Sequence, residues 1–236
     1  MALMPILALS IFLGLWYLSA RIMESTLDTL SRPMDKIVPR THAPSDEDLR
    51  SPMRLVENWA REHGFEDDVM FDFRIQNHNP GLFCRTWKNI PERTYLVFYA
   101  GLGKQIAELV TIYDDKTGVT TTNATDAHNL PAVPGAFIQA FPGLGLSDLH
   151  TAHQEGCRTL ERRTGLARQE REEDTLDLIT HSLTRQARYV RSIPGWRWKG
   201  LWWILIRKRW MIGKDVGWQL DQFGVFEPDP PKGILQ

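Results

Sequence analysis

The chain has 236 residues, of which 24% are charged and 42% are hydrophobic, and its formal net charge is −1 at pH 7. These values exclude a mostly disordered chain, and the length leaves room for one ordinary domain. The charge balance gives no general attraction to nucleic acid, and we expect no nucleic-acid partner. Cys84 and Cys157 could form one disulfide, but a domain of this size can build its core without it.

Residues 2–20 form an apolar run without a charged side chain. As a helix, this run would rise roughly 28 Å, close to the hydrocarbon thickness of a bilayer. Trp16 and Tyr17 lie near its end, where amphipathic rings favour the headgroup level. The sequence therefore predicts an N-terminal transmembrane helix, with residues 1–22 as the anchor. The alternative is a cleaved signal peptide, but no Lys or Arg precedes the run and residues 18–20 form a poor cleavage site.

Basic residues follow the apolar run, and none precedes it. The positive-inside rule therefore predicts a single-pass membrane protein whose uncleaved signal segment is the anchor and whose domain lies in the cytoplasm. The helical spacing of Met23, Leu27 and Leu30 predicts that the helix continues beyond the membrane until Pro33 ends it. Prolines further along predict a semi-rigid tether, so residues 23–50 are assigned to a juxtamembrane helix and a tether.

Residues 51–236 are predicted to form a single folded domain that begins with a helix, capped by Ser51 and with Pro52 at its first position. Val69, Phe71 and Phe73 alternate with polar residues, which indicates a strand with one solvent-exposed face. Further strand patterns cover residues 82–88, 94–100, 104–113 and 119–123. Because the turns between them are short, we expect an antiparallel β-meander of about five strands.

Residues 129–145 read as a connection rich in proline and glycine that encloses one apolar piece, residues 136–141. Two helices are predicted to follow, over residues 147–163 and 167–191. Strands followed by helices are typical of an α+β domain, and we expect the helices to pack on one face of the sheet.

His150, His153 and Cys157 have the spacing that places three metal-ligating side chains on one side of a helix. Two imidazoles and a thiolate are good zinc ligands, so these residues are weak candidates for a metal site. The same helix carries an apolar stripe that includes His153, and His181, the nearest further ligand, lies on the far side of its own helix. We therefore expect no bound metal and no other cofactor, and the sequence leaves any catalytic residues unknown.

Residues 196–214 combine tryptophans with basic side chains, and no acidic residue interrupts them. Indole rings and long basic side chains suit a membrane interface with anionic headgroups. The alternative is that the apolar centre, residues 201–206, belongs to the core, because the charges scatter around the axis of a projected helix. The residues expected to contact the membrane are Trp198, Trp202, Trp203, Arg207, Lys208 and Arg209.

These patterns predict a membrane-tethered binding or accessory protein, without enzymatic activity, that acts at the membrane surface. Its partners would be the lipid bilayer and either another membrane protein or a lipid-linked ligand. The alternative is an enzyme that acts on a membrane-associated substrate, with His150, His153 and Cys157 in its site. The two hypotheses differ in whether those side chains point into a cleft or into packed core.

Overall fold

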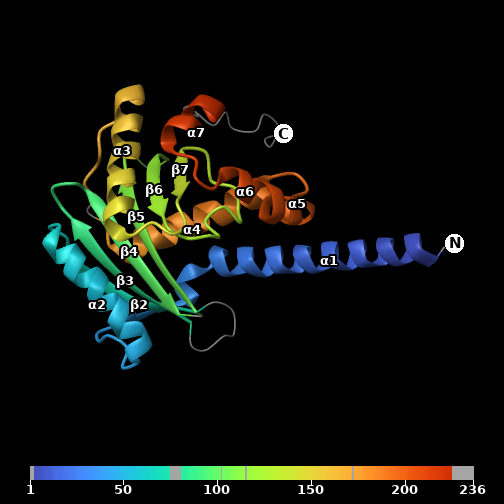
Figure 1. The fold of residues 1–236 in the computed structure, drawn as a ribbon, viewed down its shortest axis with the longest axis horizontal. Coiled ribbons are helices and arrows are strands. Elements are labelled where there is room, and N and C mark those ends of the chain that lie inside the picture. The colour runs from blue at the N-terminus through green and yellow to red at the C-terminus, as the bar shows by residue number, and fades with distance from the viewer. Residues whose placement is uncertain (1–2, 75–80, 102, 115, 172, 225–236) are drawn as a thin grey trace, which may run out of the picture.

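The computed structural model describes residues 3–74, 81–101, 103–114, 116–171 and 173–224. Its centre is a seven-stranded sheet in which every strand lies beside its neighbour in the sequence, from β1 to β7 (Figure 1). All neighbouring pairs are antiparallel except β6 and β7, which are parallel. The strands are β1 (Ile37–Arg40), β2 (Glu66–Phe73), β3 (Leu82–Asn89), β4 (Thr94–Gly101), β5 (Lys104–Ile112), β6 (Gly118–Thr122) and β7 (Ala136–Ala140). The predicted α+β class is confirmed.

Strands β2 to β6 form the predicted antiparallel meander, and two further strands extend it. β1 lies where the sequence predicts a tether, and Ile37 pairs with Phe73 of β2. Pro39 is tolerated there because an edge strand can leave one side of its backbone unpaired. At the other edge, the apolar piece inside the predicted connection becomes β7, with Phe137 beside Val119 of β6. The prediction of about five strands is therefore too low.

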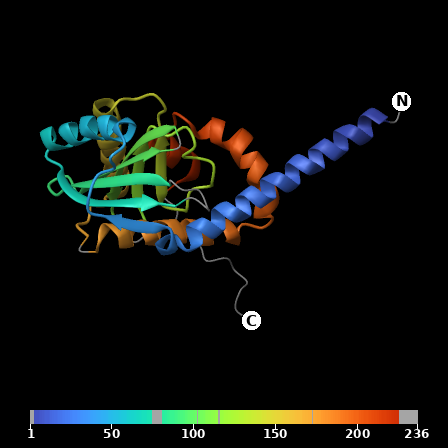
Figure 2. The same ribbon diagram turned by 90° about the horizontal axis from the view of Figure 1, so that it is seen from below.

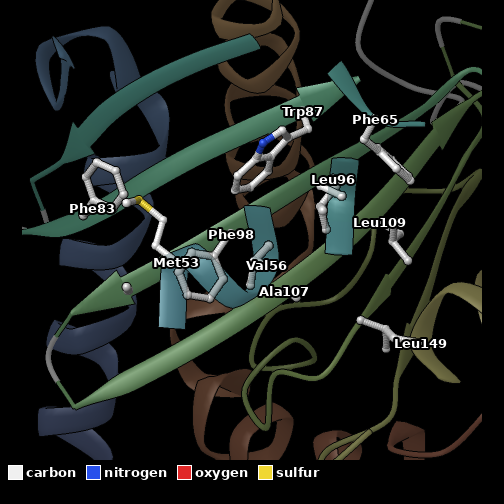
Figure 3. Packing of buried hydrophobic residues seen from close by; sticks show 12 residues of the cluster. Met53, Val56, Phe65, Phe83, Trp87, Leu96, Phe98, Ala107, Leu109 and Leu149 are labelled. Atoms are coloured by element: carbon white, nitrogen blue, oxygen red, sulfur yellow. The ribbon is translucent and has the colours of Figure 1, made fainter. Parts of the chain in front are cut away.

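Helices cover both faces of the sheet, whereas the sequence pattern predicts helices on one face (Figure 2). On the first face, Phe83 and Trp87 of β3 pack with side chains of α2 (Glu47–Glu62) and α3 (Leu146–Thr164) (Figure 3). On the opposite face, Cys84 packs near Ile179 of α4 (Thr175–Ser192). Successive side chains of a strand point to opposite faces, so the apolar residues of β3 supply both cores.

Helix boundaries differ from the prediction where a local cap or a tertiary contact decides them. α2 begins before Ser51, because the Asp46 side chain accepts a hydrogen bond from the Asp48 backbone N–H at 3.0 Å, and Pro52 lies inside the helix. α3 agrees with the predicted range to within a residue. α4 begins at Thr175 and not at residue 167, because Asp174 caps it there. Before the helix, the Gln169 backbone N–H donates to the Ile112 carbonyl of β5 at 3.1 Å.

The N-terminal helix α1 (Leu3–Ser31) projects from the body of the protein, while its C-terminal half packs against it (Figures 1 and 2). Met23 and Leu27 are buried in a cluster with Val190 of α4 and Trp203. The predicted continuation of the helix is confirmed, and it ends before Pro33, which opens the short helix η1 (Pro33–Asp35). The C-terminal helices are α5 (Trp196–Trp202), the π-turn η2 (Trp203–Arg207), α6 (Lys208–Met211) and α7 (Val216–Phe223).

In the part of the chain that the structure describes, no helix is both long and apolar enough to cross a membrane. The transmembrane helix predicted for residues 1–22 is therefore not supported by those residues. Residues 1 and 2 and the side chains of residues 3–6, 8 and 9, which belong to the predicted anchor, lie outside the described part.

Gly156 of α3 lies against Gln139 of β7, and a Cβ atom at this position would be 2.5 Å from Gln139 Nε2. Replacing Gly156 with Val should lower the free energy of unfolding by about 2 kcal/mol or more, because overpacking displaces a buried, hydrogen-bonded amide. Urea denaturation measures the change. The control is Glu155→Val, at the exposed neighbouring position, which should cost much less. Equal effects of the two variants would contradict the packing argument.

Candidate functional site

His153 of α3 is completely buried between the helix and the sheet. Its Nε2 lies 2.9 Å from Thr111 Oγ1 of β5, and its Nδ1 lies 2.9 Å from Thr121 Oγ1 of β6. Burial, with smaller contributions from Arg168 and His150, lowers the pKa of His153 to about 3. The imidazole is therefore neutral at physiological pH, and both ring nitrogens are already occupied by hydroxyl groups of the protein.

Cys157 follows one helical turn later, and its Sγ is 3.6 Å from His153 Nε2. Burial raises the pKa of this thiol, so it is neither a thiolate ligand nor an activated nucleophile. His181, the further ligand considered from the sequence, is exposed on α4, which packs on the opposite face of the sheet. Among the described residues, no group of three or more His, Cys, Asp or Glu side chains could hold a metal ion.

His150 is separated from this buried pair, because its side chain turns towards the loop between β3 and β4. Its Nε2 lies 2.9 Å from Glu92 Oε2, and Gln154 Nε2 donates to the same carboxylate oxygen at 2.8 Å. The ring of His150 also meets the edge of Trp59, with 5.5 Å between the centroids. The structure therefore does not combine His150, His153 and Cys157 in one site.

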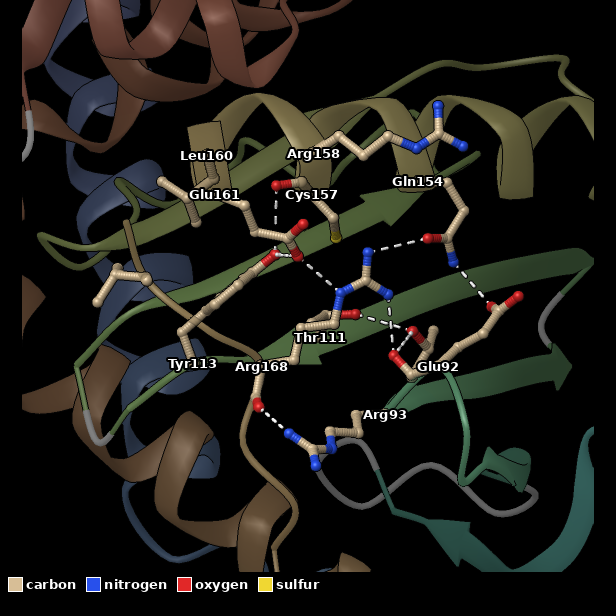
Figure 4. Close-up of polar contacts among 12 residues, drawn as sticks. Glu92, Arg93, Thr111, Tyr113, Gln154, Cys157, Arg158, Leu160, Glu161 and Arg168 are labelled. Carbon is tan, nitrogen blue, oxygen red and sulfur yellow. Dashed lines mark hydrogen bonds and ion pairs between the residues drawn. The ribbon is translucent and has the colours of Figure 1, made fainter. Parts of the chain in front are cut away.

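Arg168 is the centre of a polar network that the sequence pattern did not indicate (Figure 4). Its Nε donates to Glu161 Oε1 at 2.7 Å, its Nη1 to the Glu92 carbonyl at 2.9 Å, and its Nη2 to Gln154 Oε1 at 3.0 Å. Tyr113 completes the network by donating its hydroxyl to Glu161 Oε1 at 2.9 Å. Each of the three guanidinium nitrogens thus donates a hydrogen bond, and together these bonds hold Arg168 against α3 and the loop between β3 and β4.

A depression of about 390 Å³ lies beside this network, and its lining comes from α3 alone: Glu155, Arg158, Glu161 and Arg162. Glu155 pairs with both arginines at 3.2 Å, and Arg158 and Arg162 are exposed to solvent. Charges that neutralise one another at an open surface do not form the enclosed polar environment that acid–base chemistry requires. This depression therefore does not resemble an active site.

A second titratable pair lies on the opposite face of the sheet. Tyr99 of β4 donates its hydroxyl to Glu108 Oε2 of β5 at 3.3 Å. Burial raises the pKa of Glu108 to about 7, while hydrogen bonds from Tyr99 and Thr122 oppose that rise. A carboxyl group with this pKa can donate a proton, but Glu108 is half-buried on a strand in the middle of the sheet and is hydrogen-bonded to Tyr99. In the sequence, the only indication of this pair is Glu108, an acidic residue within the largely apolar segment that forms β5.

A surface rich in exposed apolar side chains lies where α1 and the segment from α5 to α6 run side by side (Figure 1). Trp16 of α1 stacks on Trp198 of α5, with 3.5 Å between the ring centroids and an interplanar angle of 18°. Gly200 allows the close approach, because a side chain at this position would meet Met23. Large apolar side chains remain exposed on both helices: Leu7, Ile11, Phe12, Leu13, Leu15, Tyr17, Leu18, Ile22, Trp198, Trp202, Leu205, Ile206 and Trp210.

The six residues predicted to contact a membrane divide into two groups. Trp198, Trp202 and Arg209 are exposed, and Lys208 is half-buried beside them. Trp203 is only 3% exposed and belongs to the cluster with Met23 and Leu27, while Arg207 is half-buried and turned inward. Trp203 therefore belongs to the core, and membrane contact by the other residues of this segment stays a prediction.

Comparison of the chain with protein-family models, with curated proteins and with solved structures gives no match. The functional interpretation consequently depends on the geometry of the chain itself.

The neutral state of His153 predicts how stability depends on pH. The unfolded chain takes up a proton as the pH falls below about 6.5, the usual pKa of His, and the folded chain does not until the pH approaches 3. The free energy of unfolding should therefore decrease as the pH falls from about 6.5 towards 3. His153 contributes up to about 1.4 kcal/mol of this decrease per pH unit.

A His153→Gln variant, which can still bond both threonines, should lose less stability than the original protein between pH 6.5 and 5. Chemical denaturation at each pH measures the difference. His42→Gln, at an exposed position, serves as the control. A variant with an unchanged pH profile would show that His153 is protonated in the folded state.

Proposed function

We propose that the protein is a non-enzymatic binding or accessory protein that works at a membrane surface, attached by α1 and by the segment from α5 to α6. The observation that carries the proposal is the set of large exposed apolar side chains on these two elements, which contact each other through the stack of Trp16 on Trp198. Exposed apolar side chains surround α1 between Ile11 and Leu18. A helix that is apolar on all sides is expected to be buried, in a protein core or in lipid.

The composition of the surface favours lipid over a protein partner. Trp198, Trp202 and Trp210 present indole rings, which prefer the level of lipid headgroups. Basic side chains accompany them, and no acidic residue lies in residues 196–214. Each basic side chain near an anionic bilayer contributes on the order of 1 kcal/mol. Glu24 and Asp28 of α1 are paired with Arg197 and Arg191, so they oppose this attraction less.

A binding role is favoured because the residues that the enzyme hypothesis requires do not lie together in one site. In the enzyme hypothesis, His150, His153 and Cys157 share one site, but two of them are core residues and the third pairs with Glu92. A partner at the bilayer, either another membrane protein or a lipid-linked ligand, fits an attached domain without catalytic machinery. The basic residues after the apolar run favour a cytoplasmic position for the domain.

Substitution of Ile11 and Leu15 by Gln in the full-length protein tests the role of α1. The double variant should bind vesicles about tenfold more weakly or worse, because two apolar side chains lose a burial term of about 1.5–3 kcal/mol each. Vesicle flotation measures the bound fraction. The matched control is Leu55→Gln with Ile90→Gln, since Ile90 is 53% exposed and Ile11 is 55% exposed. If both double variants bind vesicles like the original protein, α1 does not attach the chain to membranes.

Substitution of Lys208 and Arg209 by Gln tests the electrostatic contribution. Binding to anionic vesicles should weaken by about 1 kcal/mol per charge at low salt, and the difference should shrink as salt rises. The control is Arg158→Gln with Arg162→Gln, which removes two exposed cations from α3. An equal loss in both double variants would indicate a response to net charge, and this surface would then not be the contact.

A further inference from the structure

The buried stripe of the segment from α5 to α6 contains a charged residue. Gly200, Trp203 and Met211 are buried at helical spacing, and Arg207 occupies the position between the last two. The π-turn η2 ends at Arg207, where Trp203 accepts a hydrogen bond from the Lys208 backbone N–H. Such turns are uncommon in helices and are frequent at functional sites. The Nη1 end of Arg207 therefore points towards the interior of the protein, whereas Arg209 is exposed.

The guanidinium of Arg207 lacks a counter-ion within the described chain. Its Nη1 is buried and has no hydrogen-bond partner there, and no carboxylate forms an ion pair with it. An arginine cannot lose its proton to escape this position. Arg207 is half-buried, and its Nη1 end is enclosed without an acceptor, which is unfavourable for a charged group, so a group of negative charge is the expected partner.

The turn before β7 brings a second set of unpartnered groups to the same place. His128 is 1% exposed, and neither of its ring nitrogens has a partner among the described residues. The Oδ1 of Asn129 is also buried and unpartnered. Leu130 packs in the cluster that contains Trp203, so this turn lies against the segment that carries Arg207. Burial, with a contribution from the Arg207 charge, lowers the pKa of His128 to about 4, which keeps the ring neutral.

We propose that Arg207, His128 and Asn129 bind a phosphate monoester. Arg207 Nη1 and one ring N–H of His128 are donors, and they fit two phosphate oxygens. The second ring nitrogen of His128 and Asn129 Oδ1 are acceptors, and they need a donor from the ligand. A singly protonated phosphate monoester supplies both, because its P–OH donates while its other oxygens accept. A metal ion is the wrong partner, since the guanidinium repels it.

Two sources carry this chemistry, a soluble phosphate and the headgroup of phosphatidic acid. The lipid source rests on the proposed membrane function, because the segment with Arg207 also presents Trp202 and Trp210 to the surroundings. The soluble source does not rest on it. Experiments with both probes therefore separate the site from the attachment to membranes.

The first experiment measures the thermal midpoint of the full-length protein with inorganic phosphate or glycerol 3-phosphate, against chloride at equal ionic strength. The midpoint should rise and saturate with either probe, because a ligand that binds the folded state stabilises it. Arg207→Gln should weaken binding about tenfold or more, and Arg209→Gln, which removes an exposed cation, should leave it unchanged. No saturable rise, or equal loss in both variants, overturns the proposal.

Because Arg207→Gln could also affect folding, His128→Gln provides an independent measurement. The comparison adds His128→Phe, which keeps a flat ring but removes the donor and the acceptor; a folded His128→Phe variant should bind phosphate more weakly by calorimetric titration than His128→Gln, which retains one donor and one acceptor. Unchanged affinity in a folded His128→Phe variant overturns the site.

In the lipid experiment, vesicles with phosphatidic acid are compared with vesicles of phosphatidylglycerol, a phosphate diester, at equal surface charge. The original protein should prefer phosphatidic acid, and Arg207→Gln should lose this preference while it still binds both. If the protein binds phosphate but does not prefer phosphatidic acid, the phosphate site is supported and phosphatidic acid is rejected as its ligand. Failure to bind any vesicle, together with saturable phosphate binding, rejects the membrane function and leaves the site intact.

Discussion

A continuous chain of buried hydrogen bonds joins the sheet to the helices on its first face. Gln139 Nε2 donates to Thr121 Oγ1 at 2.8 Å, and the Thr121 hydroxyl can then donate to His153 Nδ1. His153 Nε2 in turn bonds Thr111, which reaches Thr94 of β4 at 2.9 Å. This series of hydrogen bonds also reaches α7, because Gln139 Oε1 accepts a hydrogen bond from the Val216 backbone N–H at 3.0 Å. Every polar group in it has a partner, and this requires a neutral imidazole.

The same constraint explains why the chemistry suggested by His153 and Cys157 is not available. A buried polar chain stabilises the fold only when it is complete, so a metal ion or a substrate would have to displace bonds that hold α3 to β5 and β6. Most of the large apolar side chains that are exposed in the described residues lie elsewhere, at the end of the molecule from which α1 projects. There α1 meets α5, and large apolar side chains are left exposed where the packing ends.

Local patterns predicted most of the architecture. The alternation around Phe71 and the short turns between strands depend only on neighbouring residues, so the strands from β2 to β6 could be predicted from the sequence. β1 and β7 could not, because each becomes a strand only through its partner. Pro39 argues against a strand until Phe71 of β2 lies beside it. The parallel pairing of β7 requires the chain to return along β6 after a connection whose course is not local.

The sequence by itself determined the amphipathic pattern of the strands, the apolar character of residues 2–20 and the gathering of tryptophans and basic residues between residues 196 and 214. Only the tertiary structure decided which of these side chains are accessible. It placed Thr111 and Thr121 around His153, and it turned Trp203 and Arg207 inward while Trp198 stayed outside. The reason is that spacing fixes the side of a helix on which a residue lies, but burial depends on what packs there from distant parts of the chain.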